Sequence, residues 1–167
     1  MDFQNLAAGR YSVRAYRPDP IDEQTLAKVL EPARLAPTAA NRQPFRLVVI
    51  DTRANEAGLR RIYRADWFVA APLVICVCAV PSEAWVRQDG ANYATVDATI
   101  VMDHLILAAS DLGLGTCWVG AFDAKAAREV LSLDDGEEPI AFTPIGYPTD
   151  QPREKKRKEM SEIVRRM

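Results

Sequence analysis

Apolar positions along the chain switch between two periods, and the switches predict helices interspersed with strands. Helical spacing of three or four residues per turn extends over residues 3–9, 22–35, 53–69, 93–112 and 123–131. Shorter and more continuous apolar runs predict strands at residues 45–50, 71–80, 116–119 and 140–147. This mixture predicts an α+β protein built around a layered sheet.

Two segments predict where the core lies. Apolar residues go most of the way round the helix at 93–112, so we expect it near the centre of the structure. Residues 71–80 are apolar at almost every position, which is typical of a strand covered on both faces. Two prolines should disturb their elements: Pro32 is expected to kink the second helix or end it early, and Pro144 to break the last strand.

Length, charge and cysteine content narrow the class of protein. The 167 residues suffice for one domain, which we expect to span residues 1–167. The net charge of −2 makes no general case for binding nucleic acid or a membrane. No signal peptide is recognisable in the first ten residues, and the odd count of three cysteines favours a reducing compartment. We therefore expect a cytoplasmic protein.

The reactive side chains do not assemble into a familiar catalytic set. His104 is the single histidine and lies within an apolar helix, so it is expected to be a packed or interface residue. Cys76 and Cys78 should share one strand face, but two thiols without a nearby histidine are a poor zinc signal. No metal site is predicted, and the chemistry has to come from a bound cofactor.

Basic residues gather near both ends of the chain. In an extended segment Arg10, Ser12 and Arg14 would face the same way, and two guanidinium groups beside a hydroxyl make a good phosphate clamp. A second cluster, residues 155–158, could add positive charge around the same phosphate. Taken alone, each cluster is better explained as a solvated basic surface.

Two further segments have the polarity that a heteroaromatic ring requires. Asn41 and Gln43 lie in a loop bounded by prolines, and their amides can both donate and accept. Residues 113–120 combine glycines, which leave backbone N–H groups accessible, with the flat apolar face of Trp118. The alternative explanations are an ordinary turn and a helix end followed by a core strand.

Four motifs in this order resemble the FMN-dependent nitroreductase family. They are Arg-Xaa-Ser-Val-Arg at residues 10–14, Ala-Pro-Thr-Ala-Xaa-Asn-Xaa-Gln-Pro-Phe at residues 36–45, Leu-Gly-Leu-Gly-Thr-Cys-Trp-Val-Gly at residues 112–120, and Pro-Ile-Gly-Tyr-Pro at residues 144–148, followed by the basic tail. Each motif is weak by itself, but their order and spacing extend the resemblance from Arg10 to Ile163.

The resemblance implies a nitroreductase-like three-layer sandwich with a central, mostly antiparallel sheet flanked by helices. It also implies a homodimer formed through the long central helix, with FMN bound in the interface and touching both subunits. NADH or NADPH would donate electrons, and a small-molecule acceptor such as a nitroaromatic or a quinone would receive them in a ping-pong cycle. Neither nucleic acid nor a membrane is an implied partner.

The same resemblance implies a set of FMN contacts but no obligatory catalytic side chain. Arg14 corresponds to the cation beside the flavin ring, and the loop from Pro37 to Gln43 would cover the ring from the partner subunit. The complete set is Arg10, Tyr11, Ser12, Arg14, Pro37, Thr38, Ala39, Asn41, Gln43, Trp118, Val119, Gly120, Lys155 and Arg157.

Two alternatives stay open at this point. The first keeps the fold and changes the reaction to flavin destruction, dehalogenation or azoline oxidation. The second is a non-catalytic module that binds nucleic acid or a protein through the basic tail, although low net basicity and the absence of interleaved aromatic residues disfavour it.

Overall fold

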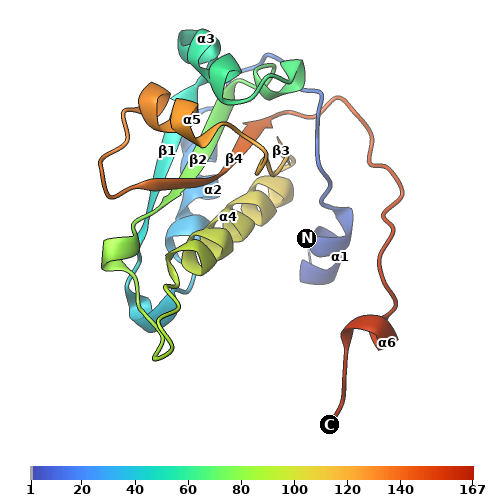
Figure 1. Ribbon diagram of the computed structural model, residues 1–167. Helices are drawn as coiled ribbons and strands as arrows, with labels where there is room; N and C mark the ends of the chain where they lie inside the picture. Colours follow the sequence, from blue (N-terminus) through green and yellow to red (C-terminus); the bar gives the residue numbers. More distant parts are fainter. Residues whose placement is uncertain (1) are drawn as a thin grey trace.

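A four-stranded sheet forms the middle layer of the computed structural model, which describes residues 2–167 (Figure 1). All neighbouring strands are antiparallel, and their spatial order is β1-β2-β4-β3. The elements in chain order are α1 (Phe3–Gly9), α2 (Glu23–Arg34), η1 (Ala39–Asn41), β1 (Phe45–Asp51), α3 (Thr52–Ile62), η2 (Asp66–Phe68), β2 (Leu73–Ala79), η3 (Pro81–Glu83), α4 (Ala94–Asp111), β3 (Gly115–Thr116), α5 (Ala124–Leu131), β4 (Glu138–Gly146) and α6 (Met160–Ile163).

Strand β2 is buried on both faces and divides the core into two halves. Ile75 and Val77 pack with α2 and α4, whereas Val74 and Cys76 pack with α3 and α5. Because successive side chains of a strand point to opposite faces, one apolar run supplies both halves. The predicted α+β sandwich with an antiparallel sheet flanked by helices is therefore confirmed.

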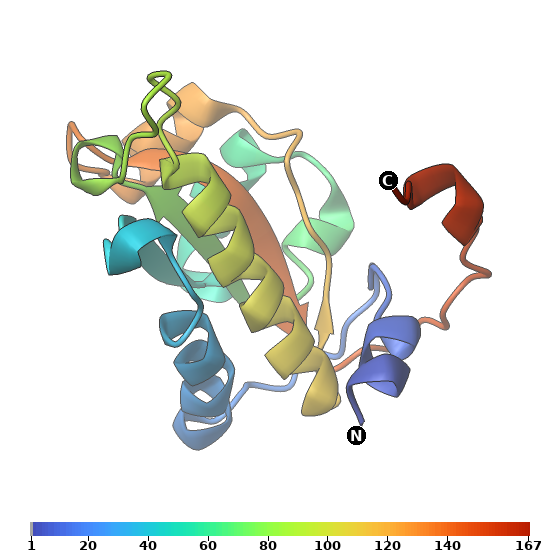
Figure 2. The same ribbon diagram turned by 90° about the horizontal axis from the view of Figure 1, so that it is seen from below.

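Helix α4 lies across one face of the sheet, next to α2 (Figure 2). Its residues Val101, Met102 and Leu105 are fully buried in the core, whereas Val96 and Thr99 are exposed, so within one chain only one face of the helix has the predicted central position. It ends where Gly113 adopts a φ of 75°, a left-handed conformation that glycine accepts readily. None of the helices in residues 2–167 has the length and apolar character needed to cross a membrane.

Aspartate side chains begin four of the helices. In each case the carboxylate accepts a hydrogen bond from the backbone N–H three residues later, which satisfies a donor that the first helical turn leaves free. The pairs are Asp2 with Asn5, Asp22 with Thr25, Asp51 with Ala54 and Asp123 with Ala126. The helix starts predicted near Asp2, Asp22 and Asp123 are confirmed.

Helix α2 accommodates its proline. It continues beyond Pro32 to Arg34, so the prediction that Pro32 ends the helix early is wrong. A proline removes one hydrogen bond from a helix. The buried side chains of Leu26, Val29 and Ala33 pack in the same cluster as α4, and this packing holds the last turn in place.

Strand β4 also runs unbroken through its proline, contrary to the prediction for Pro144. The N–H of Phe142 donates to Val119, on the side of β4 that faces away from β2. Backbone groups two residues apart in a strand point the same way, so the nitrogen of Pro144 also faces away from β2. No ladder hydrogen bond to β2 is lost.

Two predicted elements are shorter in the structure. Helix α3 ends at Ile62 instead of extending over residues 53–69, because Tyr63 is extended and Phe68 turns inward to pack on the ring of Phe142. The strand predicted at residues 116–119 is reduced to β3, after which Val119 pairs separately with Phe142. In both places long-range apolar contacts override the local pattern.

The two ends of the chain meet beside the sheet. The N–H of Arg17 donates to the carbonyl of Tyr147, and the N–H of Thr149 donates to the carbonyl of Ala15, both at 2.9 Å. Residues 11–17 and 147–150 therefore run side by side. Beyond Asp150 the chain leaves the sheet and passes α1 on its way to α6 (Figure 1).

Gly115 is a test of how closely this N-terminal segment packs. A Cβ at Gly115 would lie 2.7 Å from a methyl carbon of Val13, whereas one at Gly136 would meet nothing within 4 Å. We expect Gly115→Ala to lower the free energy of unfolding by about 1–3 kcal/mol through overpacking, as measured in urea. Gly136→Ala is the control, and equal stability of the two variants would contradict the close packing.

Candidate functional site

The two ends of the chain line a shared cleft of about 300 Å³. Its lining carries six cationic side chains and two carboxylates, so the cleft is strongly positive for its size. The lining residues are Arg10, Tyr11, Ser12, Arg14, Asp150, Gln151, Arg153, Glu154, Lys155, Lys156 and Arg157.

The structure therefore brings both basic clusters that the sequence singled out to one place. The N-terminal cluster is held there by β3: Ser12 forms a parallel bridge with Thr116, and the N–H of Val13 donates to the carbonyl of Thr116. The side chain of Val13 is buried in the core, which leaves Ser12 and Arg14 facing the cleft.

Asp150 fixes the point at which the tail leaves the body of the protein. Its Oδ2 accepts a hydrogen bond of 2.8 Å from the N–H of Arg14. The hydroxyl of Tyr11 donates to the carbonyl of Asp150 at 2.9 Å and reaches its Oδ1 at 3.2 Å. Burial, and then the nearby Asp150 carboxylate, raise the pKa of Tyr11, so its hydroxyl stays protonated as a donor.

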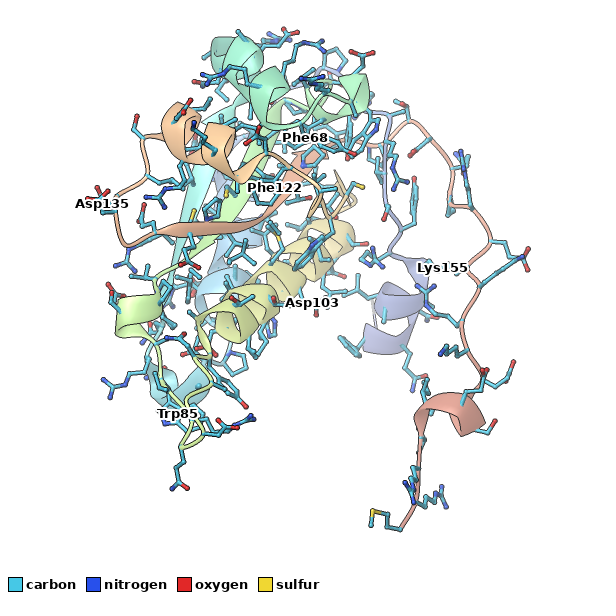
Figure 3. The ribbon with its side chains drawn as sticks, in the orientation of Figure 1. Phe68, Trp85, Asp103, Phe122, Asp135 and Lys155 are labelled. Carbon is cyan, nitrogen blue, oxygen red and sulfur yellow. The ribbon has the colours of Figure 1, made fainter. Side chains whose placement is uncertain are left out.

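Cations crowd together across the cleft. Figure 3 shows Lys155 between the tail and α1, where its ammonium group donates to the carbonyl of Ala8. Partial burial, and then repulsion from Arg10 and Arg157, lower the pKa of Lys155. An anion among these groups would relieve that repulsion, and Arg is well suited to bind one because its fork of donors matches the oxygens of a phosphate.

An aromatic ring lies next to Arg14, one of the residues that line the cleft. The guanidinium carbon of Arg14 lies 5.4 Å from the ring centre of Trp67, within the range of a cation–π contact. Trp118, which follows β3, is 37% exposed. The space beside the Gly120 backbone is open, because a Cβ added there would have one neighbour within 4 Å, the Trp118 indole nitrogen at 3.8 Å. Val119 is buried in the core, so it can offer a ligand its backbone alone.

Cys117 lies between these groups but is poorly suited to act as a nucleophile. Its thiol is buried, and burial raises its pKa above the usual value, an effect that the positive charge of Arg14 offsets only in part. A thiol has to lose its proton to attack a substrate. The electrostatics of this region therefore support binding rather than covalent catalysis.

The predicted ring-covering loop has a strained backbone. Ala40, Asn41 and Gln43 adopt φ values of 51°, 54° and 52°, a left-handed conformation that is uncommon for residues with side chains. The side chains of Asn41 and Gln43 are exposed. Strain of this kind is concentrated at ligand clamps and other functional sites.

This loop lies far from the basic cleft. The N–H of Ala39 donates to Asp97 in the first turn of α4, whereas Ser110 in its last turn lines a small pocket with Arg10 and Tyr11. Helix α4 has 18 residues and is about 27 Å long. The loop residues Pro37, Thr38, Ala39, Asn41 and Gln43 are thus not brought to the cleft within one chain.

Sequence reasoning missed Asp150 and Trp67. Asp150 follows the Pro-Ile-Gly-Tyr-Pro motif by two residues, but its hydrogen bonds are made to residues at the other end of the chain. Trp67 falls within the helix predicted over residues 53–69, whereas in the structure α3 ends at Ile62 and Trp67 contacts Arg14. Neither contact has a local signal.

The chain matches the nitroreductase family over residues 7–67 and 55–147. Among solved structures, a nitroreductase family protein of Clostridium difficile 630 is 40% identical and superposes with a TM-score of 0.89 over 99% of this chain and 98% of its own. An oxidoreductase containing FMN shares the fold at 23% identity, with a TM-score of 0.78 over 90% of this chain and 79% of its own.

Curated relatives are similar over most of their length. An NADH dehydrogenase of Thermus thermophilus is 27% identical over 90% of this chain and 89% of its own. A 5,6-dimethylbenzimidazole synthase of Rhodospirillum rubrum is 32% identical over 85% of this chain and 80% of its own. The order of elements, the position of the four motifs and these similarities agree, and the chain belongs to the nitroreductase family.

Proposed function

We propose that this protein binds FMN and uses it to transfer electrons from NADH or NADPH to a small oxidised acceptor. The basic cleft is the observation that carries the proposal, because it gathers six cationic side chains from both ends of the chain. A phosphate monoester carries a charge of roughly −1.5 to −2 at neutral pH and several strong acceptor oxygens. The charge and donors of the cleft fit the phosphate end of FMN.

Bound FMN would supply the redox chemistry, accepting a hydride from the reduced nicotinamide and delivering electrons to the acceptor. The chain's own residues would bind and orient the cofactor. Arg10, Ser12, Lys155 and Arg157 would hold its phosphate. Arg14, kept in place by Trp67, would put a permanent positive charge beside the ring system, where it favours the electron-rich form.

The proposed site is complete only in a homodimer. The Asn41 loop and the basic cleft lie at opposite ends of α4, and two antiparallel copies of a helix place the first end of one beside the last end of the other. The outer face of α4 borders an apolar groove of about 520 Å³ that includes Phe3, Leu107 and His104. Packing across this face would bury the groove and join each loop to the partner's cleft.

The similarity to the 5,6-dimethylbenzimidazole synthase favours one alternative, in which the same site fragments its own flavin. The two proposals share the cofactor and differ in its fate. A flavin that is used repeatedly requires an electron acceptor at each turnover, whereas a flavin that is consumed does not survive the reaction. Dehalogenation and azoline oxidation are separate alternatives, which also keep the fold and change the reaction.

The proposed function is tested by the colour and activity of the purified protein. We expect a yellow preparation with a flavin spectrum that oxidises NADH or NADPH in the presence of menadione or nitrofurazone and retains its FMN. Loss of the flavin spectrum with formation of dimethylbenzimidazole would favour the alternative. A colourless protein that FMN cannot reconstitute would contradict both proposals and favour a non-catalytic binding module.

The shared site predicts complementation between two inactive variants. Arg10→Ala with Arg14→Ala removes two of the six cleft cations, and Asn41→Asp with Gln43→Glu removes the loop amides while keeping the side-chain sizes. We expect each double variant to lose FMN. Mixing the two under conditions that exchange subunits should restore FMN at about a quarter of the sites, because half of the dimers are then mixed and each has one intact site.

Bound flavin is measured by its absorbance after gel filtration of the mixture. Each variant mixed with itself is the control and should remain colourless. A mixture that stays colourless while subunit exchange is demonstrated would show that both groups of residues act in the same subunit. A double variant that keeps its FMN would show that its residues do not contact the cofactor.

Asp150 has two opposing effects on a phosphate in the cleft, and two substitutions separate them. Asp150→Asn keeps an acceptor for the N–H of Arg14 and removes a negative charge, so we expect FMN to bind severalfold more tightly. Asp150→Ala releases the tail, and we expect FMN to bind about tenfold more weakly. Fluorescence titration measures both effects, and riboflavin, which lacks the phosphate, should show no gain with Asp150→Asn.

A further inference from the structure

Asp97 is a charged residue in the core of the protein. It lies in the first turn of α4 and is only 1% exposed. Its Oδ1 accepts a hydrogen bond of 2.9 Å from the N–H of Ala39, while its Oδ2 is buried and has no hydrogen-bond partner within residues 2–167. Burying a carboxylate with so few donors is costly, even at the positive end of a helix.

The segment that Asp97 holds is itself in a conformation of high energy. Ala40, Asn41 and Gln43 all have left-handed backbones, and residues with side chains occupy this region only where the surroundings enforce it. Inside the loop, the carbonyl of Thr38 accepts from the N–H of Asn41, and the hydroxyl of Thr38 accepts from the N–H of Gln43. These contacts close the loop on itself but do not attach it to the core.

The hydrogen bond from Ala39 to Asp97 makes that attachment. It joins the loop to the rigid start of α4, the same helix whose other end borders the basic cleft. A charged acceptor forms a stronger hydrogen bond than a neutral one. Because Asp97 is buried, water does not compete for this hydrogen bond, and the bond holds the strained loop against the helix.

We infer that Asp97 is a positioning residue, which holds the loop Thr38–Gln43 so that the amides of Asn41 and Gln43 are presented ready for the flavin ring. The role in ring binding rests on the proposed function, but the attachment of the loop does not. Asp97 touches neither the phosphate cleft nor its lining residues. Its loss should therefore weaken contacts to the ring and leave contacts to the phosphate intact.

Hydrogen–deuterium exchange of the full chain without added FMN tests the attachment. In Asp97→Ala we expect the backbone N–H groups of Asn41 and Gln43 to exchange roughly tenfold to a hundredfold faster, since the hydrogen bond that attaches the loop to Asp97 is lost. Asp97→Asn keeps a neutral acceptor and should give a smaller increase. Asp103→Ala removes an exposed carboxylate from the same helix and should leave the loop unchanged.

A second variant removes the donor instead of the acceptor. Ala39→Pro lacks the N–H, and the backbone angles suit it because Thr38 is extended (φ −130°, ψ 155°) and Ala39 begins a short helix. The proline Cδ takes the place of the amide hydrogen, so this variant breaks the contact and also pushes the Asp97 carboxylate away. Faster exchange in this variant supports the inference even when Asp97→Ala does not fold. Loop amides that exchange at the wild-type rate in Ala39→Pro and in every folded Asp97 variant would overturn it.

Ligand binding then separates positioning from general damage to the fold. We expect Asp97→Asn and Ala39→Pro to bind inorganic phosphate as the unmodified protein does and FMN several times more weakly, with both measured by calorimetry. Equal loss of phosphate and FMN would contradict a role limited to the loop. An unmodified protein that binds no FMN would reject the proposed function, while the exchange experiment would still decide the role of Asp97.

Discussion

The rigid length of α4 is the constraint on which the rest of the site depends. A helix of 18 residues packed against the sheet cannot bend to bring its ends together, so whatever each end carries is held apart. One end supports the strained loop through Asp97, and the other lies beside the basic cleft. A ligand that needs both groups requires a second copy of the chain.

Electrostatics explains how one chain can maintain such a positive cleft. Arg10 and Arg157 repel Lys155, and the residues of the tail after Asp150 are exposed or only partly buried, so no apolar packing offsets this repulsion. Asp150 attaches the tail to the body of the protein. Its carboxylate accepts a hydrogen bond from the N–H of Arg14, next to the last backbone hydrogen bond between the two chain ends, from Thr149 to Ala15. The cleft proposed to bind a phosphate thus contains a carboxylate of its own, which lowers its positive charge but fixes the position of the tail.

Features that depend on a few neighbouring residues were predictable from the sequence. The helices at residues 3–9 and 123–131 were placed close to their true starts, where Asp2 and Asp123 form N-cap hydrogen bonds that span only three residues. The burial of β2 on both faces was predicted from its uninterrupted apolar run. The early end of α2 at Pro32, the break of β4 at Pro144 and the length of α3 were predicted wrongly. Packing between distant residues holds the last turn of α2 and ends α3 early, as in the contact of Phe68 with Phe142, whereas Pro144 is tolerated because its nitrogen faces away from β2.

The sequence by itself determined the family, the layered α+β fold and the chemical types of donor available to a cofactor, because periodicity, caps and motif order are all written in short stretches of chain. Only the tertiary structure decided which donors share one cleft, that Trp67 supports Arg14, and that Asp97 anchors the loop. These contacts join residues separated by dozens of positions, and their formation depends on how whole elements pack rather than on any local preference.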